Sequence, residues 1–122
     1  MGSKETDARI RIDKMLLESG WKLPGWHKDK EINVKTEIKN EHGEADYVLL
    51  NSKGFFLCTV EAKNSSKSPL VGKEKSREYA QSLRSRFIIL SNGIKHYLWD
   101  TKLGNPHLID RLPTQKYLEL RG

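Results

Sequence analysis

The chain has 122 residues, of which 36% are hydrophobic and 31% charged, and its formal net charge is +6. This length predicts a single compact domain over residues 1–122, and the composition excludes a disordered chain. The longest apolar run, Phe55–Val60, is far too short to cross a bilayer, so we expect no membrane association. Cys58 is the only cysteine, which excludes an intrachain disulfide and fits a cytoplasmic protein. The basic balance favours a polyanionic partner, with nucleic acid ahead of a membrane surface.

The first third of the chain is predicted to hold one helix and a loop. Ala8, Ile12 and Leu16 recur at helical spacing, which predicts a helix over residues 4–19. Gly20 stands where a helix commonly ends with a glycine. The next stretch, WKLPGWHKDKE, contains a proline and a glycine and is typical of a loop.

Three strands are predicted next, joined by short turns. The stretch INVKTEIKN, residues 32–40, alternates apolar and charged residues, which indicates a half-buried strand. The turn EHGE leads into a second strand, ADYVLLN, and the turn SKG leads into a third strand that begins at Phe55. Such short connections predict an antiparallel meander.

The second half of the chain predicts a helix followed by a hairpin. Residues 72–83 have helical character, RFIILS forms a short buried strand, and Asn92-Gly93 is a hairpin signal before the strand IKHYLWD. A helix between the third and fourth strands predicts a crossover that makes these two strands parallel. The sequence therefore predicts an α/β fold with a mixed sheet flanked by helices. It gives no prediction for the tail after Thr101.

Charged residues at the end of the most apolar strand point to a functional site. Alternate side chains of a strand share a face, so Glu61 and Lys63 point the same way. Asp46 stands near the start of the preceding antiparallel strand, which places it beside them. Two adjacent carboxylates repel each other, and Mg²⁺ between them would offset that repulsion. The backbone carbonyl of Ala62 would add a ligand, and Lys63 would orient the attacking water.

The stretches GEADYVLL and GFFLCTVEAK together resemble the PD-(D/E)xK nuclease motif. Asp46 takes the first acidic position, Glu61 the second and Lys63 the lysine. The ordered blocks RIDKMLLESGW, VEAK, REYA and FIILSNG make the chain similar, over nearly its whole length, to the N-terminal nuclease domain of the R subunit (HsdR) of type I restriction enzymes.

This resemblance implies a restriction-endonuclease-like core that cuts DNA phosphodiesters with Mg²⁺, for which Mn²⁺ would substitute. The implied partners are double-stranded DNA, other restriction-modification subunits and motor domains that consume ATP. No motor motif is present in these 122 residues. Relatives carry an acid on the first helix that touches the metal through water; Glu5 and Asp7 are the candidates here, and Glu5 fits the block ETDAR better. They also carry a Gln-x-x-x-Tyr motif, in which this chain keeps Tyr79 but has Lys75 in place of the glutamine.

The basic run from Lys63 to Arg86 predicts a surface that contacts DNA phosphates. Two simpler interpretations remain open: Tyr79 anchors the core, and Glu61 with Lys63 forms an ordinary exposed ion pair. The histidines show no zinc-ligand spacing and are expected at the surface or in loops. The candidate DNA-binding residues are Lys67, Lys73, Lys75, Arg77 and Tyr79.

Two functions follow from these observations. The first is a Mg²⁺-dependent DNA endonuclease domain of a type I restriction-like system. The alternative is a non-catalytic nucleic-acid-binding or docking module on the same fold, which the lysine in place of glutamine supports. Metal binding that depends on both Asp46 and Glu61 would separate the two, because a docking module has no use for it.

Overall fold

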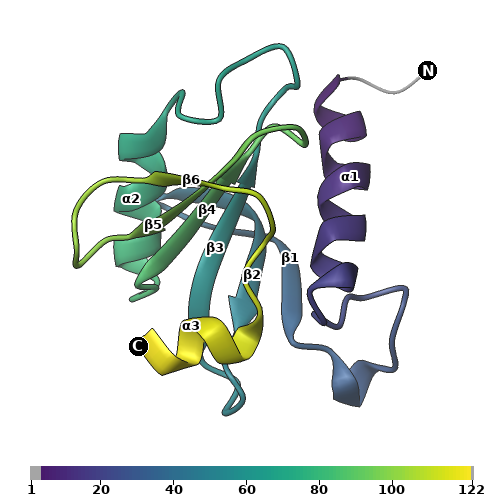
Figure 1. Ribbon diagram of the computed structural model, residues 1–122. Coiled ribbons are helices and arrows are strands. Elements are labelled where there is room, and N and C mark those ends of the chain that lie inside the picture. The colour runs from purple at the N-terminus through teal and green to yellow at the C-terminus, as the bar shows by residue number, and fades with distance from the viewer. Residues whose placement is uncertain (1–3, 122) are drawn as a thin grey trace.

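A computed structural model describes residues 4–121 and shows one mixed sheet with three helices (Figure 1). The six strands lie in the sheet in their chain order, from β1 to β6. The elements are α1 (Lys4–Glu18), a short 3-10 helix (Asp29–Glu31), β1 (Val34–Asn40), β2 (Gly43–Leu50), β3 (Phe56–Ala62), α2 (Lys73–Ser82), β4 (Phe87–Ser91), β5 (His96–Asp100), β6 (His107–Ile109) and α3 (Gln115–Arg121).

The predicted topology is confirmed. Neighbouring strands are antiparallel except β3 and β4, which pair in parallel with Cys58 opposite Phe87 and Ala62 opposite Ser91. Helix α2 connects these two strands, because parallel neighbours need a crossover. The β4–β5 hairpin turns at Asn92-Gly93, where Gly93 adopts a left-handed φ of 87°. The fold class is therefore the α/β architecture that the sequence indicates.

The two faces of the sheet are covered by different helices (Figure 1). One face packs against α1 and α3 through Ile12, Leu16 and Leu118, which meet Cys58 and Val60 of β3 in the largest core cluster. Cys58 is fully buried. The other face packs against α2, and its apolar clusters include Tyr79 and Ala80. Glu61 alternates with Val60 and so faces the α2 side.

The tail after Thr101 adds a sixth strand and a third helix that the sequence did not indicate. Strand β6 pairs with β5, and two side chains from the N-terminal part fasten the segment before α3. The indole of Trp21 donates to the carbonyl of Pro113 at 2.9 Å, and the hydroxyl of Ser19 donates to the carbonyl of Leu112 at 2.7 Å. These contacts join residues more than 90 positions apart, so no local sequence pattern predicts them.

One expectation about the histidines is wrong. His96 is only 6% exposed, and its Nδ1 lies 2.7 Å from the hydroxyl of Ser91 on the neighbouring strand. Burial lowers the pKa of His96, which favours the neutral ring. His96 lies in β5, between its pairing partners Ser91 of β4 and Ile109 of β6. Within residues 4–121, no helix is long and apolar enough to span a membrane.

Replacing Tyr47 with phenylalanine should destabilise the fold. The buried hydroxyl of Tyr47 joins β2 to α1, with Asp13 Oδ1 at 2.5 Å and the carbonyl oxygen of Arg9 at 3.1 Å. A hydrogen bond to a charged group contributes about 1.5–3 kcal/mol, so Tyr47→Phe should lower the free energy of unfolding by that amount. Urea unfolding measures it. A change below about 0.5 kcal/mol, the usual range of neutral surface substitutions, would show that the contact does not hold α1 in place.

Candidate active site

Asp46 lies where the pairing between β2 and β3 stops. The last paired residues on this side are Tyr47 and Val60, and the next position along each strand holds Asp46 and Glu61. Oδ2 of Asp46 accepts a hydrogen bond of 2.7 Å from the backbone N–H of Ala62. The carboxylate therefore occupies the gap at the C-terminal end of β3, beside the backbone of Ala62. Because β2 begins at Gly43, Asp46 stands inside this strand and not at its start.

Glu61 and Lys63 flank the same end of β3. Burial of the Glu61 carboxyl and the nearby charge of Asp46 raise the pKa of Glu61 to about 7, against the opposing effect of Lys63. Lys63 follows the strand directly, and its N–H donates to the carbonyl of Ser91 at 2.8 Å. Its ammonium comes close to Gly72, where a β-carbon would lie 3.5 Å from Nζ. Gly72 adopts a left-handed φ of 76° at the start of α2.

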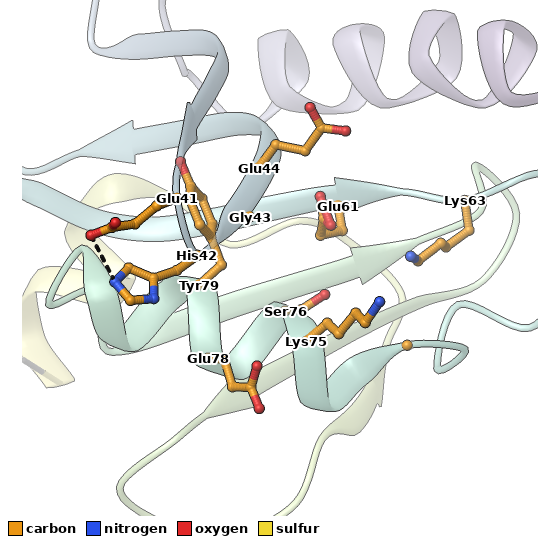
Figure 2. A pocket seen from close by; sticks show the side chains of 11 residues that line it. Glu41, His42, Gly43, Glu44, Glu61, Lys63, Lys75, Ser76, Glu78 and Tyr79 are labelled. Atoms are coloured by element: carbon orange, nitrogen blue, oxygen red, sulfur yellow. Dashed lines mark ion pairs between the residues drawn. The ribbon is translucent and has the colours of Figure 1, made fainter.

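Two adjoining hollows surround these residues. The smaller has a volume of about 260 Å³ and is lined by Asp46, Glu61, Ala62 and Lys63 among others. The larger, about 460 Å³, shares Glu61 and Lys63 and continues towards α2. Figure 2 shows that Lys63 and Lys75 reach towards the space beside Glu61 from two different elements. The structure thus brings together the three residues predicted to be catalytic.

The predicted DNA-binding lysines and arginine divide into two groups. Lys67 lines the smaller hollow and Lys75 the larger. The ammonium of Lys73 instead lies 5.4 Å from the ring centroid of Trp99, and Arg77 forms a 2.6 Å ion pair with its helix neighbour Glu74. Neither of these two lines the hollows beside Glu61. Of the predicted DNA-binding residues, Lys67 and Lys75 therefore lie nearest to the candidate site.

Tyr79 serves the core, which is the simpler of its two predicted roles. It is 2% exposed, and its hydroxyl donates to the carbonyl of Ile38 at 2.8 Å. Its side chain lies beside Gly43, where an added β-carbon would be 3.5 Å from Cβ and Cδ1 of Tyr79, an ordinary contact, and where the φ of 145° favours glycine. Tyr79 also lines the larger hollow. Tyr79 therefore anchors α2 to the strands that carry the site.

The structure adds residues that sequence reasoning missed. Glu44 lines both hollows, and its charge contributes to the raised pKa of Glu61 after burial and Asp46. Its position two residues before Asp46 was the available signal. The side chain of Glu5 lies outside the described residues, so its predicted role remains a prediction. In the part of the chain that the structure describes, no three His, Cys, Asp or Glu side chains gather as a metal-ligand group.

The raised pKa of Glu61 predicts a pH-dependent stability in the absence of metal. The unfolded carboxyl has its ordinary pKa of 4.5, so the folded state holds the extra proton between about pH 4.5 and 7. The contribution of Glu61 to stability should be greatest below pH 4.5 and fall as the pH rises to 7, by up to about 3 kcal/mol. Glu61→Gln should remove this dependence and be the more stable protein at pH 8. Equal unfolding midpoints for the two proteins at pH 8 would contradict the assignment.

The fold of this chain has a counterpart among restriction-enzyme structures. The match is a fragment assigned as an HsdR subunit of a type I restriction enzyme from Vibrio vulnificus YJ016, with a TM-score of 0.77 and 25% sequence identity. The alignment covers 96% of this chain and 25% of that chain, so the present sequence spans about a quarter of its length. No protein-family model matches the chain, and no curated protein matches it.

Proposed function

We propose that this chain is a DNA endonuclease domain of a type I restriction-like system and hydrolyses phosphodiester bonds with Mg²⁺. The observation that supports this most is the meeting of Asp46, Glu61 and Lys63 in one hollow at the end of β3. The similarity to an HsdR fragment supports the association with a restriction system. Double-stranded DNA and other restriction subunits are the partners that this proposal implies.

The donor set fits a hard divalent cation. Asp46 and Glu61 occupy neighbouring positions on β2 and β3, and the pKa of Glu61 is raised to about 7 by burial and by the charge of Asp46. A cation between the two carboxylates would offset both effects, and oxygen ligands suit Mg²⁺. The backbone of Ala62 lies next to Asp46 and would supply a carbonyl ligand. Bound Mg²⁺ polarises a phosphoryl oxygen and lowers the pKa of its water.

Lys63 contributes a positively charged side chain to the candidate site. Its ammonium lies near enough to Glu61 to oppose the rise in the pKa of that residue, and both line the two hollows. In this place it would hold the attacking water and stabilise the negative charge that develops on phosphorus. Asp46 and Glu61 would hold the metal, and Lys63 would contact the phosphate or its attacking water in the same hollow.

One observation favours the second candidate, a non-catalytic nucleic-acid-binding module. Lys75 adds a second cation, beside Lys63, to the larger hollow. A module of this kind would hold a phosphate in the hollow between Lys63 and Lys75 without cutting it. Incubation of plasmid DNA with Mg²⁺, with and without a chelator, separates the two, since only the endonuclease gives metal-dependent nicking.

Both candidates predict electrostatic DNA binding with little dependence on sequence. The negative slope of log affinity against log salt concentration should become shallower by about 0.9 for each phosphate contact removed. Lys67→Ala and Lys75→Ala should each produce this change, because both residues line the hollows. Lys73→Ala is the matched control, since its ammonium lies against Trp99. A slope that is unchanged in Lys67→Ala and Lys75→Ala would place the DNA on another surface.

A further inference from the structure

The backbone that carries Asp46 is interrupted on both sides. Towards β3 the pairing stops at Tyr47. Towards β1, Thr36 pairs with Tyr47 and Ile38 pairs with Ala45, but the strand pairing skips Asp46 between them. The residue of β1 at the level of Asp46 is Glu37, whose φ is 53°. A residue with a β-carbon adopts this left-handed conformation at a cost, so surrounding contacts must hold it. Asp46 thus depends on contacts other than regular strand pairing for its position.

Arg9 of α1 makes contacts on both strands at this interruption. Its Nη1 lies 3.1 Å from Oε1 of Glu37, and its guanidinium lies 5.3 Å from the ring centroid of Tyr47. Its carbonyl accepts the hydroxyl of Tyr47 at 3.1 Å. Tyr47 is the immediate neighbour of Asp46 in the chain. One side chain and its backbone therefore connect the strained position of β1, the strand β2 and the first helix.

Asp46 also acts on Arg9 electrostatically. Burial lowers the pKa of the Arg9 guanidinium, but the hydrogen bond to Glu37, the Tyr47 side chain and the charge of Asp46 outweigh it and raise the pKa. The positive charge of Arg9 is thus close enough to Asp46 to interact with it, and Lys63 lines the same hollow as Asp46. The ion pair with Glu37 adds little stability, since the Glu37 side chain is 72% exposed.

We propose that Arg9 is a positioning residue of the site: through Glu37 and Tyr47 it fixes β2 at Asp46 so that this carboxylate stays on the N–H of Ala62 and faces the hollow. Its consequence for metal binding rests on the proposed function above. A planar, permanently charged guanidinium suits the task, because it pairs with a carboxylate and stacks on an aromatic ring at once. A lysine offers only the charge.

Hydrogen exchange of the Ala62 amide measures the position of Asp46 without reference to any activity. In Arg9→Ala this amide should exchange at least about 10-fold faster than in the unaltered protein, while amides elsewhere in β3 keep their protection. Arg11→Ala is the matched control, because it removes the same charge from an exposed position of the same helix. Arg9→Lys should restore part of the protection.

Glu37→Gly separates positioning from strain. Glycine adopts a φ of 53° freely, so this variant keeps the backbone conformation and removes only the carboxylate that Arg9 holds. We expect an unchanged or higher unfolding temperature together with faster exchange at Ala62. If Arg9 merely stabilised the fold, Glu37→Gly would leave the Ala62 amide as protected as before.

Calorimetric titration of the same proteins with Mn²⁺ completes the test. Loss of a residue that orients a metal ligand costs about 10- to 100-fold in affinity, so Arg9→Ala should bind Mn²⁺ at least 10-fold more weakly and Arg11→Ala equally well. An Ala62 amide that is unchanged in both Arg9→Ala and Glu37→Gly overturns the inference. If that amide is deprotected but the unaltered protein binds no Mn²⁺, Arg9 still positions Asp46 and the proposed metal-dependent function fails.

Discussion

Asp46→Asn and Glu61→Gln should each lose both Mn²⁺ binding and DNA cleavage by more than about 100-fold, since each neutralises a ligand and even ligand-supporting groups are worth 10- to 100-fold. Neither change should unfold the protein. The two carboxylates occupy neighbouring strand positions, and burial and the charge of Asp46 both oppose ionisation of Glu61. Removing one negative charge relieves this repulsion. Calorimetry measures the affinity for Mn²⁺, and nicking of plasmid DNA measures cleavage.

Glu78→Gln is the matched control for these two variants. Glu78 is an exposed carboxylate that lines the larger hollow but not the smaller one that holds Asp46. It should bind Mn²⁺ and cut DNA as the unaltered protein does. Full Mn²⁺ affinity in Asp46→Asn, or the same loss in all three variants, would remove the basis for a metal site between Asp46 and Glu61.

Lys63→Ala should lose most of the cleavage rate and keep its affinity for Mn²⁺. A donor that acts on charge developing in the transition state contributes about 10²–10³ in rate, so cleavage at saturating DNA should fall by that factor. Mn²⁺ affinity should stay or rise slightly, because the Lys63 ammonium repels a cation bound at the nearby Glu61 carboxylate. Single-turnover cleavage and calorimetry provide the two measurements.

Lys95→Ala serves as the control for Lys63→Ala, because Lys95 is an exposed lysine of the β4–β5 hairpin and lies outside both hollows. It should cut at the unaltered rate. Cleavage at the unaltered rate by Lys63→Ala would end the catalytic assignment of this lysine. Loss of Mn²⁺ binding in Lys63→Ala would instead give the lysine a structural role in holding Glu61.

The main elements could be predicted because their signals are local. The apolar run of β3 and Asn92-Gly93 in the hairpin each depend on neighbouring residues. The alternation expected in β1 is wrong beyond Val34, because the left-handed Glu37 interrupts it: Val34 packs in the α1-side cluster and Ile38 against the α2-side cluster. The crossover between β3 and β4 followed from the helix between them. The tail could not be predicted, since β6 is three residues long and the segment before α3 is fastened by distant partners such as Trp21.

The candidate site, too, could be predicted only in part. Asp46, Glu61 and Lys63 could be placed together because strand alternation and antiparallel pairing fix their neighbourhood. The contact between Arg9 and Glu37 could not be predicted, since it joins residues 28 positions apart. It also depends on the left-handed backbone of Glu37 within β1, which carries no sequence signal. Burial of Tyr79 was open from the sequence because a tyrosine suits both a core and a surface.

The most direct test of the metal site is a crystal structure of this chain soaked in Mn²⁺, with anomalous diffraction to locate the ion. The account predicts one anomalous peak in the smaller hollow, with carboxylate oxygens of both Asp46 and Glu61 at about 2.0–2.3 Å, close to the distances that Mg²⁺ demands. Ala62 should still donate to Asp46. A hollow without a peak at saturating Mn²⁺, or a peak bound by other residues, would contradict the account.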